Sequence, residues 1–125
     1  MGRWYTRPMV FVADVETALA FYVDGMGFAE AWSFRDDGGR KFVAQVDRDD
    51  AEIILSSQWP EKRGKAMLFI ELIAEDWNGL PERLTERGVA FTWGWWGYRT
   101  LIVADPDGNE LYFPDPSDPG SQRDV

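Results

Sequence analysis

The sequence contains no cysteine and no histidine among its 125 residues. Without cysteine, disulfide bonds and thiolate metal sites are both impossible. Without histidine, the chain lacks the commonest transition-metal ligand and the commonest general base near neutral pH. A nucleophilic triad of the usual kind therefore cannot be assembled, and carboxylates are the groups that remain for acid–base chemistry.

Positive charge is scarce, with 13 Lys and Arg against 22 Asp and Glu and a net charge of −9. Nucleic acid is therefore not expected as a partner, because phosphates are bound by Lys and Arg. An acidic surface can attract a cationic partner, or it can serve only to keep the protein soluble.

Long hydrophobic runs are missing as well. No apolar stretch approaches the roughly 20 residues of a membrane span. The first residues, "MGRWYTRP", lack the apolar centre of a signal peptide. We therefore expect a cytoplasmic protein that has no contact with a membrane.

An internal duplication is the main pattern that is present. Residues 12–32 match residues 73–93 at a constant offset of 61. The matched pairs include Leu19 with Leu80, Gly27 with Gly88, and Trp32 with Trp93. After a shift in offset to 58, Asp47, Asp49 and Glu52 match Asp105, Asp107 and Glu110. The chain therefore contains two copies of one unit.

Each copy reads as a strand, a helix and three further strands. In the first copy we expect strands at 9–13, 28–34, 41–47 and 51–57, and a helix that Asp14 caps and Gly27 ends. In the second we expect strands at 66–74, 89–93, 98–104 and 109–114, and a helix with Pro81 in its first turn that ends at Gly88. The predicted fold is α+β, with two tandem βαβββ modules forming curved mixed sheets around a cleft. We expect one domain over residues 1–125, with modules at about 7–59 and 66–114 and a frayed tail at 115–125.

The stretches "VADVETALAFYVDGMGF" and "WGYRTLIVADPDGNELYF", at 12–28 and 96–113, place these modules in a known context. The chain resembles the vicinal oxygen chelate superfamily, which includes glyoxalase I, extradiol dioxygenases and bleomycin-resistance proteins. The resemblance implies the glyoxalase/bleomycin-resistance fold. It also implies, for the enzymes of the group, a divalent metal held inside the cup by His, Glu or Gln.

The resemblance assigns the metal-ligand positions residue by residue. They fall on Arg7, Ile54, Leu68 or Phe69 (depending on register), and Tyr112. These side chains do not make a divalent metal site, which needs several His or carboxylate ligands. Glu110 shares a strand face with Tyr112 but has no histidine to act with it. We therefore expect no metal and no cofactor.

Aromatic residues make up 15% of the sequence, with 7 Trp and the cluster "TWGWWGYR" at 92–99. Aromatic faces bind planar and cationic ligands by stacking and cation–π contacts. The candidate ligand-binding residues are Trp32, Phe34, Glu71, Trp93, Trp95, Trp96, Tyr98, Arg99 and Tyr112. Since Trp32 and Trp93 are equivalent in the repeat, we expect them to face each other across the pseudo-twofold axis. The alternative for both is plain core packing.

An acidic, tryptophan-rich chain without metal ligands is similar to the bleomycin-resistance branch. "RPMVFVADVETALAFY", in which Pro8 follows Arg7, is also similar to that branch. The resemblance implies a homodimer that sequesters a planar cationic drug or metabolite without catalysis, with antibiotic resistance as the associated role. The alternative is an enzyme of the lyase or dioxygenase kind with an atypical site, for which Glu52, Glu71 and Glu110 are the strand-borne carboxylates.

Overall fold

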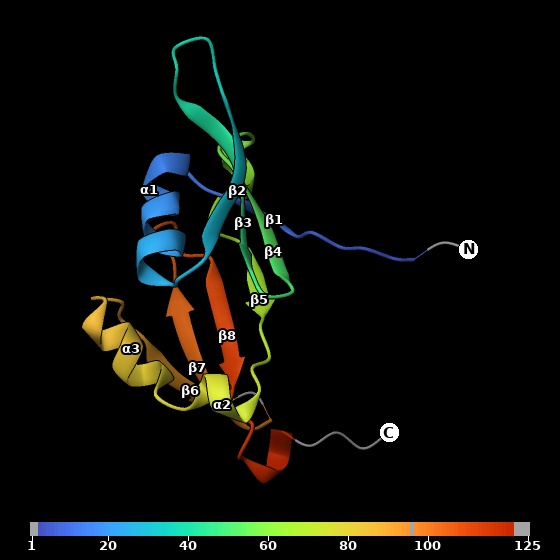
Figure 1. Ribbon diagram of the computed structural model, residues 1–125, viewed down its shortest axis with the longest axis vertical. Helices are drawn as coiled ribbons and strands as arrows, with labels where there is room; N and C mark the ends of the chain where they lie inside the picture. The colour runs from blue at the N-terminus through green and yellow to red at the C-terminus, as the bar shows by residue number, and fades with distance from the viewer. Residues whose placement is uncertain (1–2, 96, 122–125) are drawn as a thin grey trace.

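The computed structural model describes residues 3–95 and 97–121, which build two four-stranded sheets (Figure 1). Sheet A contains β1 (Met9–Phe11), β2 (Ala29–Arg35), β3 (Lys41–Arg48) and β4 (Ala51–Ser56) in the order β1-β4-β3-β2. Sheet B contains β5 (Met67–Phe69), β6 (Thr92–Trp95), β7 (Arg99–Ala104) and β8 (Glu110–Pro114) in the order β5-β8-β7-β6. The first strand of each sheet pairs in parallel with the last, and the other pairs are antiparallel. The predicted α+β architecture is confirmed, and the two sheets of the chain do not close on each other.

The main helix of each unit lies on the same side of the two sheets (Figure 1). In the first unit α1 (Val15–Leu19) runs directly into the π-helical segment η1 (Ala20–Gly25), and Gly27, at φ +80°, ends it as expected. In the second unit the helix is split into α2 (Ala74–Trp77) and α3 (Leu80–Glu86) by Gly79 at φ +79°. The short 3-10 turns are η2 (Pro60–Lys62) and η3 (Pro119–Ser121). No helix of the described residues has the length and apolar character that crossing a membrane requires.

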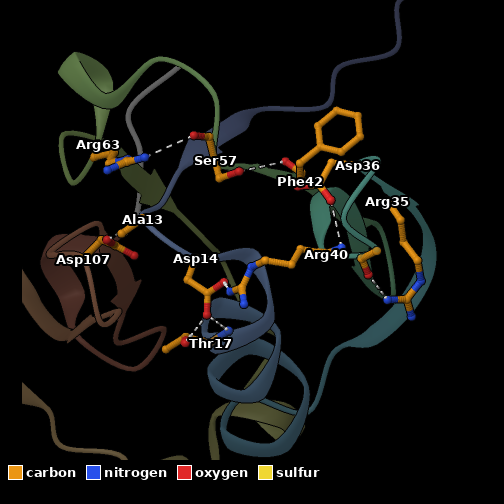
Figure 2. Close-up of polar contacts among 11 residues, drawn as sticks. Ala13, Asp14, Thr17, Arg35, Asp36, Arg40, Phe42, Ser57, Arg63 and Asp107 are labelled. Carbon is orange, nitrogen blue, oxygen red and sulfur yellow. Dashed lines mark hydrogen bonds and ion pairs between the residues drawn. The ribbon is translucent and has the colours of Figure 1, made fainter.

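Asp14 caps α1, as the sequence predicts. Its Oδ2 accepts a hydrogen bond from the backbone N–H of Thr17 at 3.3 Å and one from the Thr17 hydroxyl at 2.6 Å. Its Oδ1 accepts from Arg40 Nη2 at 2.5 Å, which brings the β2–β3 hairpin against the start of the helix (Figure 2). These bonds, that of the Thr17 hydroxyl first, hold the pKa of Asp14 below its ordinary value. Asp14 thus joins helix α1 to the hairpin.

Replacing Asp14 with alanine is expected to lower the free energy of unfolding by about 1 kcal/mol at neutral pH, the usual cost of losing an N-cap. Since folding lowers the pKa of Asp14, its stabilising contribution is complete above the unfolded-state pKa of about 4 and is lost as the pH falls through the folded-state value. Urea unfolding at neutral and acidic pH measures both effects. Asp14→Ser, which keeps a capping oxygen, is the matched control and should retain most of the stability. A loss in Asp14→Ala that persists undiminished at low pH would contradict the assignment.

The turn between β7 and β8 joins the two units. Asn109 is fully buried, accepts from the backbone N–H of Ala66 at 2.9 Å and donates from Nδ2 to the Phe11 carbonyl at 3.1 Å. Asp107 accepts from the backbone N–H of Ala13 at 2.9 Å, a pair that lies side by side in Figure 2. Asp105 accepts from the hydroxyl of Tyr22 at 3.0 Å. The "DPDGN" motif therefore forms the hairpin turn between β7 and β8 and also links the two units by hydrogen bonds.

Residues 115–121, which were expected to fray, are held against sheet B instead. Asp115 is only 4% exposed, and its carboxylate pairs with Arg99 Nη1 at 3.3 Å. Asp118 accepts from the backbone N–H of Arg99 at 2.9 Å. The Pro- and Ser-rich composition predicts a loose tail. The two carboxylates instead bind Arg99, which is in place to receive them only once β7 has formed.

Candidate functional site

One face of sheet A is covered by α1, and no helix of the described residues lies on the other face, called here open face A. Directly paired residues on neighbouring strands share a face of the sheet. Val10, Leu55 and Ala44 are paired in this way and are fully buried on the α1 side. Open face A is crossed by the row Met9, Ile54, Gln45 and Trp32. Phe34 stands two residues beyond Trp32 on the same face, 61% exposed, with its ring centroid 5.5 Å from that of Trp32.

Gln45 organises the polar groups of open face A. Its side chain is 5% exposed and uses both ends of the amide. Oε1 accepts from Arg7 Nη1 at 2.9 Å and from the Trp32 indole at 3.1 Å. Nε2 donates to Asp47 Oδ1 and Glu52 Oε1, both at 2.9 Å. The network fixes one edge of the Trp32 ring and sets two carboxylates beside it.

The segment before β1 lies against this network. The Tyr5 hydroxyl donates to Glu52, and this hydrogen bond raises the pKa of Tyr5 above its ordinary value. The Arg7 guanidinium lies 5.5 Å from the centroid of the Tyr5 ring. Trp4, which precedes Tyr5, is fully exposed to solvent, with a relative exposure of 102%. Open face A therefore carries aromatic rings, two carboxylates and one arginine.

Sheet B has two such faces as well, and the one that lies away from the helices of the described residues is called here open face B. Phe69 pairs with Tyr112, and Tyr112 pairs with Ile102, so these three share the open face. The Phe69 ring lies 6.3 Å from Tyr98 and 6.5 Å from Tyr112, measured between centroids. The Tyr112 hydroxyl donates to Glu110 Oε1 at 3.0 Å. Reduced contact with water, and then Glu110, raises the pKa of Tyr112.

The superfamily's metal-ligand positions fall on these two open faces. Ile54 lies on face A, and Phe69 and Tyr112 lie on face B, whereas Leu68 pairs with buried Leu111 on the covered side. Register therefore selects Phe69 from the two alternatives. A divalent metal does not fit this donor set, because isoleucine and phenylalanine offer no ligand atom and tyrosine only a weak one. Within residues 3–95 and 97–121, no three acidic side chains are grouped closely enough to hold a metal ion.

The expectation that Trp32 and Trp93 face each other is wrong. Trp93 pairs with Leu101, which is fully buried on the helix side of sheet B. Its ring packs edge-on against Trp77 of α2, with centroids 6.1 Å apart. The structural counterpart of Trp32 is Thr92, because Thr92 pairs with Ile102 as Trp32 pairs with Gln45. A bulge between Glu30 and Trp32 shifts the register, and a shift of one residue moves a side chain to the other face.

The same register removes Trp95 and Arg99 from the expected cleft. They pair with each other on the side of Trp93, where Trp95 is 72% exposed. The Arg99 guanidinium stacks on Trp93, 3.8 Å from its centroid, and binds Asp115. Trp96 lies outside the described residues. Trp32 and Phe34 on face A, and Tyr98 and Tyr112 on face B, are the predicted ligand residues that the structure places on an open face.

Glu71, a candidate ligand-binding residue, lies at a cavity of about 490 Å³ between the two units. The cavity is bounded by the end of η1, the β3–β4 turn, the segment after β5, and helices α2 and α3. Its walls are therefore on the helix side of the chain and do not include Trp32, Phe34, Tyr98 or Tyr112.

Several residues of these surfaces were not singled out from the sequence. Gln45 and Asp47 on face A, and Met67 on face B, are the main ones. Two-residue alternation in "QVD" and "MLF" is the signal that could have found them, because alternate residues of a strand share a face. Arg48 and Arg87, which line the cavity, gave no such signal.

The chain belongs to the Glyoxalase/Bleomycin resistance protein/Dioxygenase superfamily, whose family model matches residues 4–113. No match is found among curated proteins. The assignment agrees with the two βαβββ units and with the sheet order described above.

Solved structures of the superfamily share the fold. TnmS3, an antibiotic-binding protein from Streptomyces sp. CB03234, is 30% identical with a TM-score of 0.70, over 94% of this chain and 99% of that one. The bleomycin-binding protein from bleomycin-producing Streptomyces verticillus, complexed with copper(II)-bleomycin, is 23% identical with a TM-score of 0.70, over 91% and 97%. A glyoxalase/bleomycin resistance protein from Catenulispora acidiphila is 23% identical with a TM-score of 0.71, over 90% and 97%.

Proposed function

We propose that this chain binds a planar, cationic drug or metabolite on its open faces and sequesters it without chemical change. The observation that carries the proposal is the set of aromatic rings on these faces. Phe34 is 61% exposed and Phe69 is 43% exposed, with Trp32, Tyr98 and Tyr112 beside them. Rings held side by side on a rigid sheet offer flat surfaces to a flat ligand. The 30% identity to an antibiotic-binding protein supports the same function.

The charges on the open faces favour a cation. Asp47, Glu52 and Glu110 share these faces with one arginine, Arg7. The net charge of −9 adds a long-range attraction that weakens with salt. A cation beside an aromatic ring gains cation–π energy, and a nearby carboxylate strengthens its binding. A cationic ligand therefore suits both the rings and the carboxylates.

The chemistry of the open faces supports binding without turnover. The superfamily's metal-ligand positions hold Arg7, Ile54, Phe69 and Tyr112, which do not fit a divalent metal. The carboxylates of Glu52 and Glu110 are each engaged by a tyrosine hydroxyl. We propose that antibiotic resistance by sequestration is the biological role.

The proposed binding unit is a homodimer. A second copy would cover exposed apolar surface that a single chain leaves in water, including Trp4 at 102%, Tyr5 at 66% and Met67 at 61%. Large uncovered apolar patches mark interaction sites, and closed twofold pairs are the commonest assemblies. Light scattering is expected to give about twice the chain mass of 14.3 kDa at tens of micromolar. A single-chain mass that holds up to millimolar concentration would contradict the homodimer.

The experiment for the proposed function is a titration with bleomycin, a cationic glycopeptide that carries planar aromatic rings, followed by analysis of the ligand. We expect bound bleomycin to quench tryptophan fluorescence and to be recovered at its original mass. An anionic planar compound such as naphthalene-2-sulfonate should give weaker binding at the open faces. If bleomycin and a panel of planar cationic dyes leave the fluorescence unchanged, sequestration of such ligands is refuted. A new product in the recovered ligand would favour the enzyme alternative.

A further inference from the structure

The cavity between the two units is lined by apolar residues and by two arginines that lie close together. Its volume is about 490 Å³, within the range of small-molecule sites. Phe28, Leu80, Leu84 and Phe113 form apolar wall, and each is at most 6% exposed. Arg48 comes from the end of β3 and Arg87 from the end of α3, so each unit supplies one guanidinium. The feature is separate from the open faces and from the function proposed for them.

The two guanidinium groups converge on Gly27. Their Nη1 atoms lie 2.8 Å (Arg87) and 2.9 Å (Arg48) from the point that a Cβ on residue 27 would occupy. Two guanidinium groups this close together repel each other. In a chain with 22 acidic residues, a carboxylate between them would be the usual way to reduce this repulsion. Nevertheless, among the described residues no carboxylate lies within 4.0 Å of either group.

Only one of the two arginines, Arg48, has a structural role at the end of the helix. Arg48 Nη1 donates to the Met26 carbonyl at 2.7 Å, a usual partner for a cation where helical carbonyls are left free. The Arg87 guanidinium makes no hydrogen bond or ion pair within residues 3–95 and 97–121. Arg83, which also lines the cavity, donates to the carbonyls of Asp76 and Asn78 and is used structurally. Arg87 and the outer nitrogens of Arg48 are therefore available to a ligand.

The cavity wall also carries carboxylates, at Asp49, Asp50, Glu71 and Asp76. They exclude a highly charged anion, because repulsion from four carboxylates would oppose it. A monoanion with an apolar body suits this lining. Its charged end can bind the two guanidinium groups, and its body can pack against the apolar wall. We infer that this cavity is a second ligand site, which binds an amphipathic organic monoanion through Arg48 and Arg87.

The test uses 2-naphthoate as the probe and 2-naphthylmethylammonium as its cationic counterpart of the same shape. Amide NMR on the full chain reports both locations, through the N–H of Gly27 for the cavity and the indole N–H of Trp32 for open face A. Naphthoate is expected to shift Gly27 saturably and to leave Trp32 unchanged. The ammonium compound is expected to leave Gly27 unchanged.

The matched variants are Arg87→Gln and Arg35→Gln, which remove the same charge at the cavity and on the exposed β2–β3 hairpin. Arg87→Gln should weaken naphthoate binding about tenfold or more, the loss expected for a charge-assisted bond. Arg35→Gln should bind naphthoate as the wild type does. Equal responses of Gly27 to both probes, or equal affinity in Arg87→Gln and wild type, would overturn the inference. Bleomycin binding should be unaffected by Arg87→Gln, so this site and the open faces fail or succeed independently.

Discussion

Replacing Asn109 with alanine is expected to lower the free energy of unfolding by about 3 kcal/mol, since three hydrogen bonds worth roughly 1 kcal/mol each are lost. The side chain is fully buried and bonds to the Ala66 N–H, the Phe11 carbonyl and Asp105 Oδ2 at 2.9, 3.1 and 2.9 Å. Alanine supplies none of these partners. Urea unfolding followed by tryptophan fluorescence measures the loss.

The control for this variant is Asn78→Ala. Asn78 is exposed, and within the described residues its bonds are made by its backbone rather than by its side chain. We expect its stability to stay within about 0.5 kcal/mol of wild type. Equal stability of Asn109→Ala and Asn78→Ala would show that the turn does not hold the units together.

The role of this turn illustrates what the sequence could predict and what it could not. "DPDG" predicts a hairpin turn locally, because Asp, Pro and Gly suit the backbone angles of a turn. The bond from Asn109 to Phe11 joins residues 98 positions apart, and no local pattern contains it. Gly64 shows the same limit, since a Cβ there would come within 2.3 Å of the Asp107 carbonyl oxygen, a contact visible only after folding.

The open faces were predicted in part, and register decides which part. Alternation along a strand is enough to put Trp32 and Phe34 together, and Glu110 with Tyr112. It fails for Trp93, because the bulge at Glu30 and Trp32 breaks the one-to-one relation between the two copies. A sequence repeat shows which residues of the two copies correspond. The face of the sheet on which each side chain lies is set by the register of the neighbouring strand. Thr92, and not Trp93, therefore takes the place of Trp32 in sheet B.

The cavity could not be predicted at all. Its arginines, Arg48 and Arg87, lie 39 positions apart and become neighbours only when the β3–β4 turn of the first unit meets α3 of the second. In the other direction, the turn of the second unit reaches the first unit by direct hydrogen bonds through Asp105, Asp107 and Asn109. The two equivalent turns therefore differ in their surroundings. The β7–β8 turn is hydrogen-bonded to the first unit, whereas the β3–β4 turn borders the cavity.

Removing a ring from an open face is expected to weaken bleomycin binding by about tenfold for Trp32→Ala and similarly for Tyr112→Ala, from lost stacking and lost apolar burial. The effects should add, because the two rings lie on different sheets. Isothermal titration calorimetry is the measurement, since it does not depend on the tryptophan removed. Affinity should also fall as salt is raised, because Asp47, Glu52 and Glu110 attract the cation.

Trp95→Ala is the matched control for these variants. Trp95 is more exposed than Trp32, at 72%, but its pairing with Arg99 puts it on the helix side of sheet B. A ligand that simply adheres to exposed tryptophan would lose affinity in Trp95→Ala, whereas a ligand of the open faces would not. We expect Trp95→Ala to bind bleomycin as the wild type does. If Trp95→Ala loses affinity while Trp32→Ala and Tyr112→Ala keep it, the ligand binds on the helix side, and the open faces are not the site.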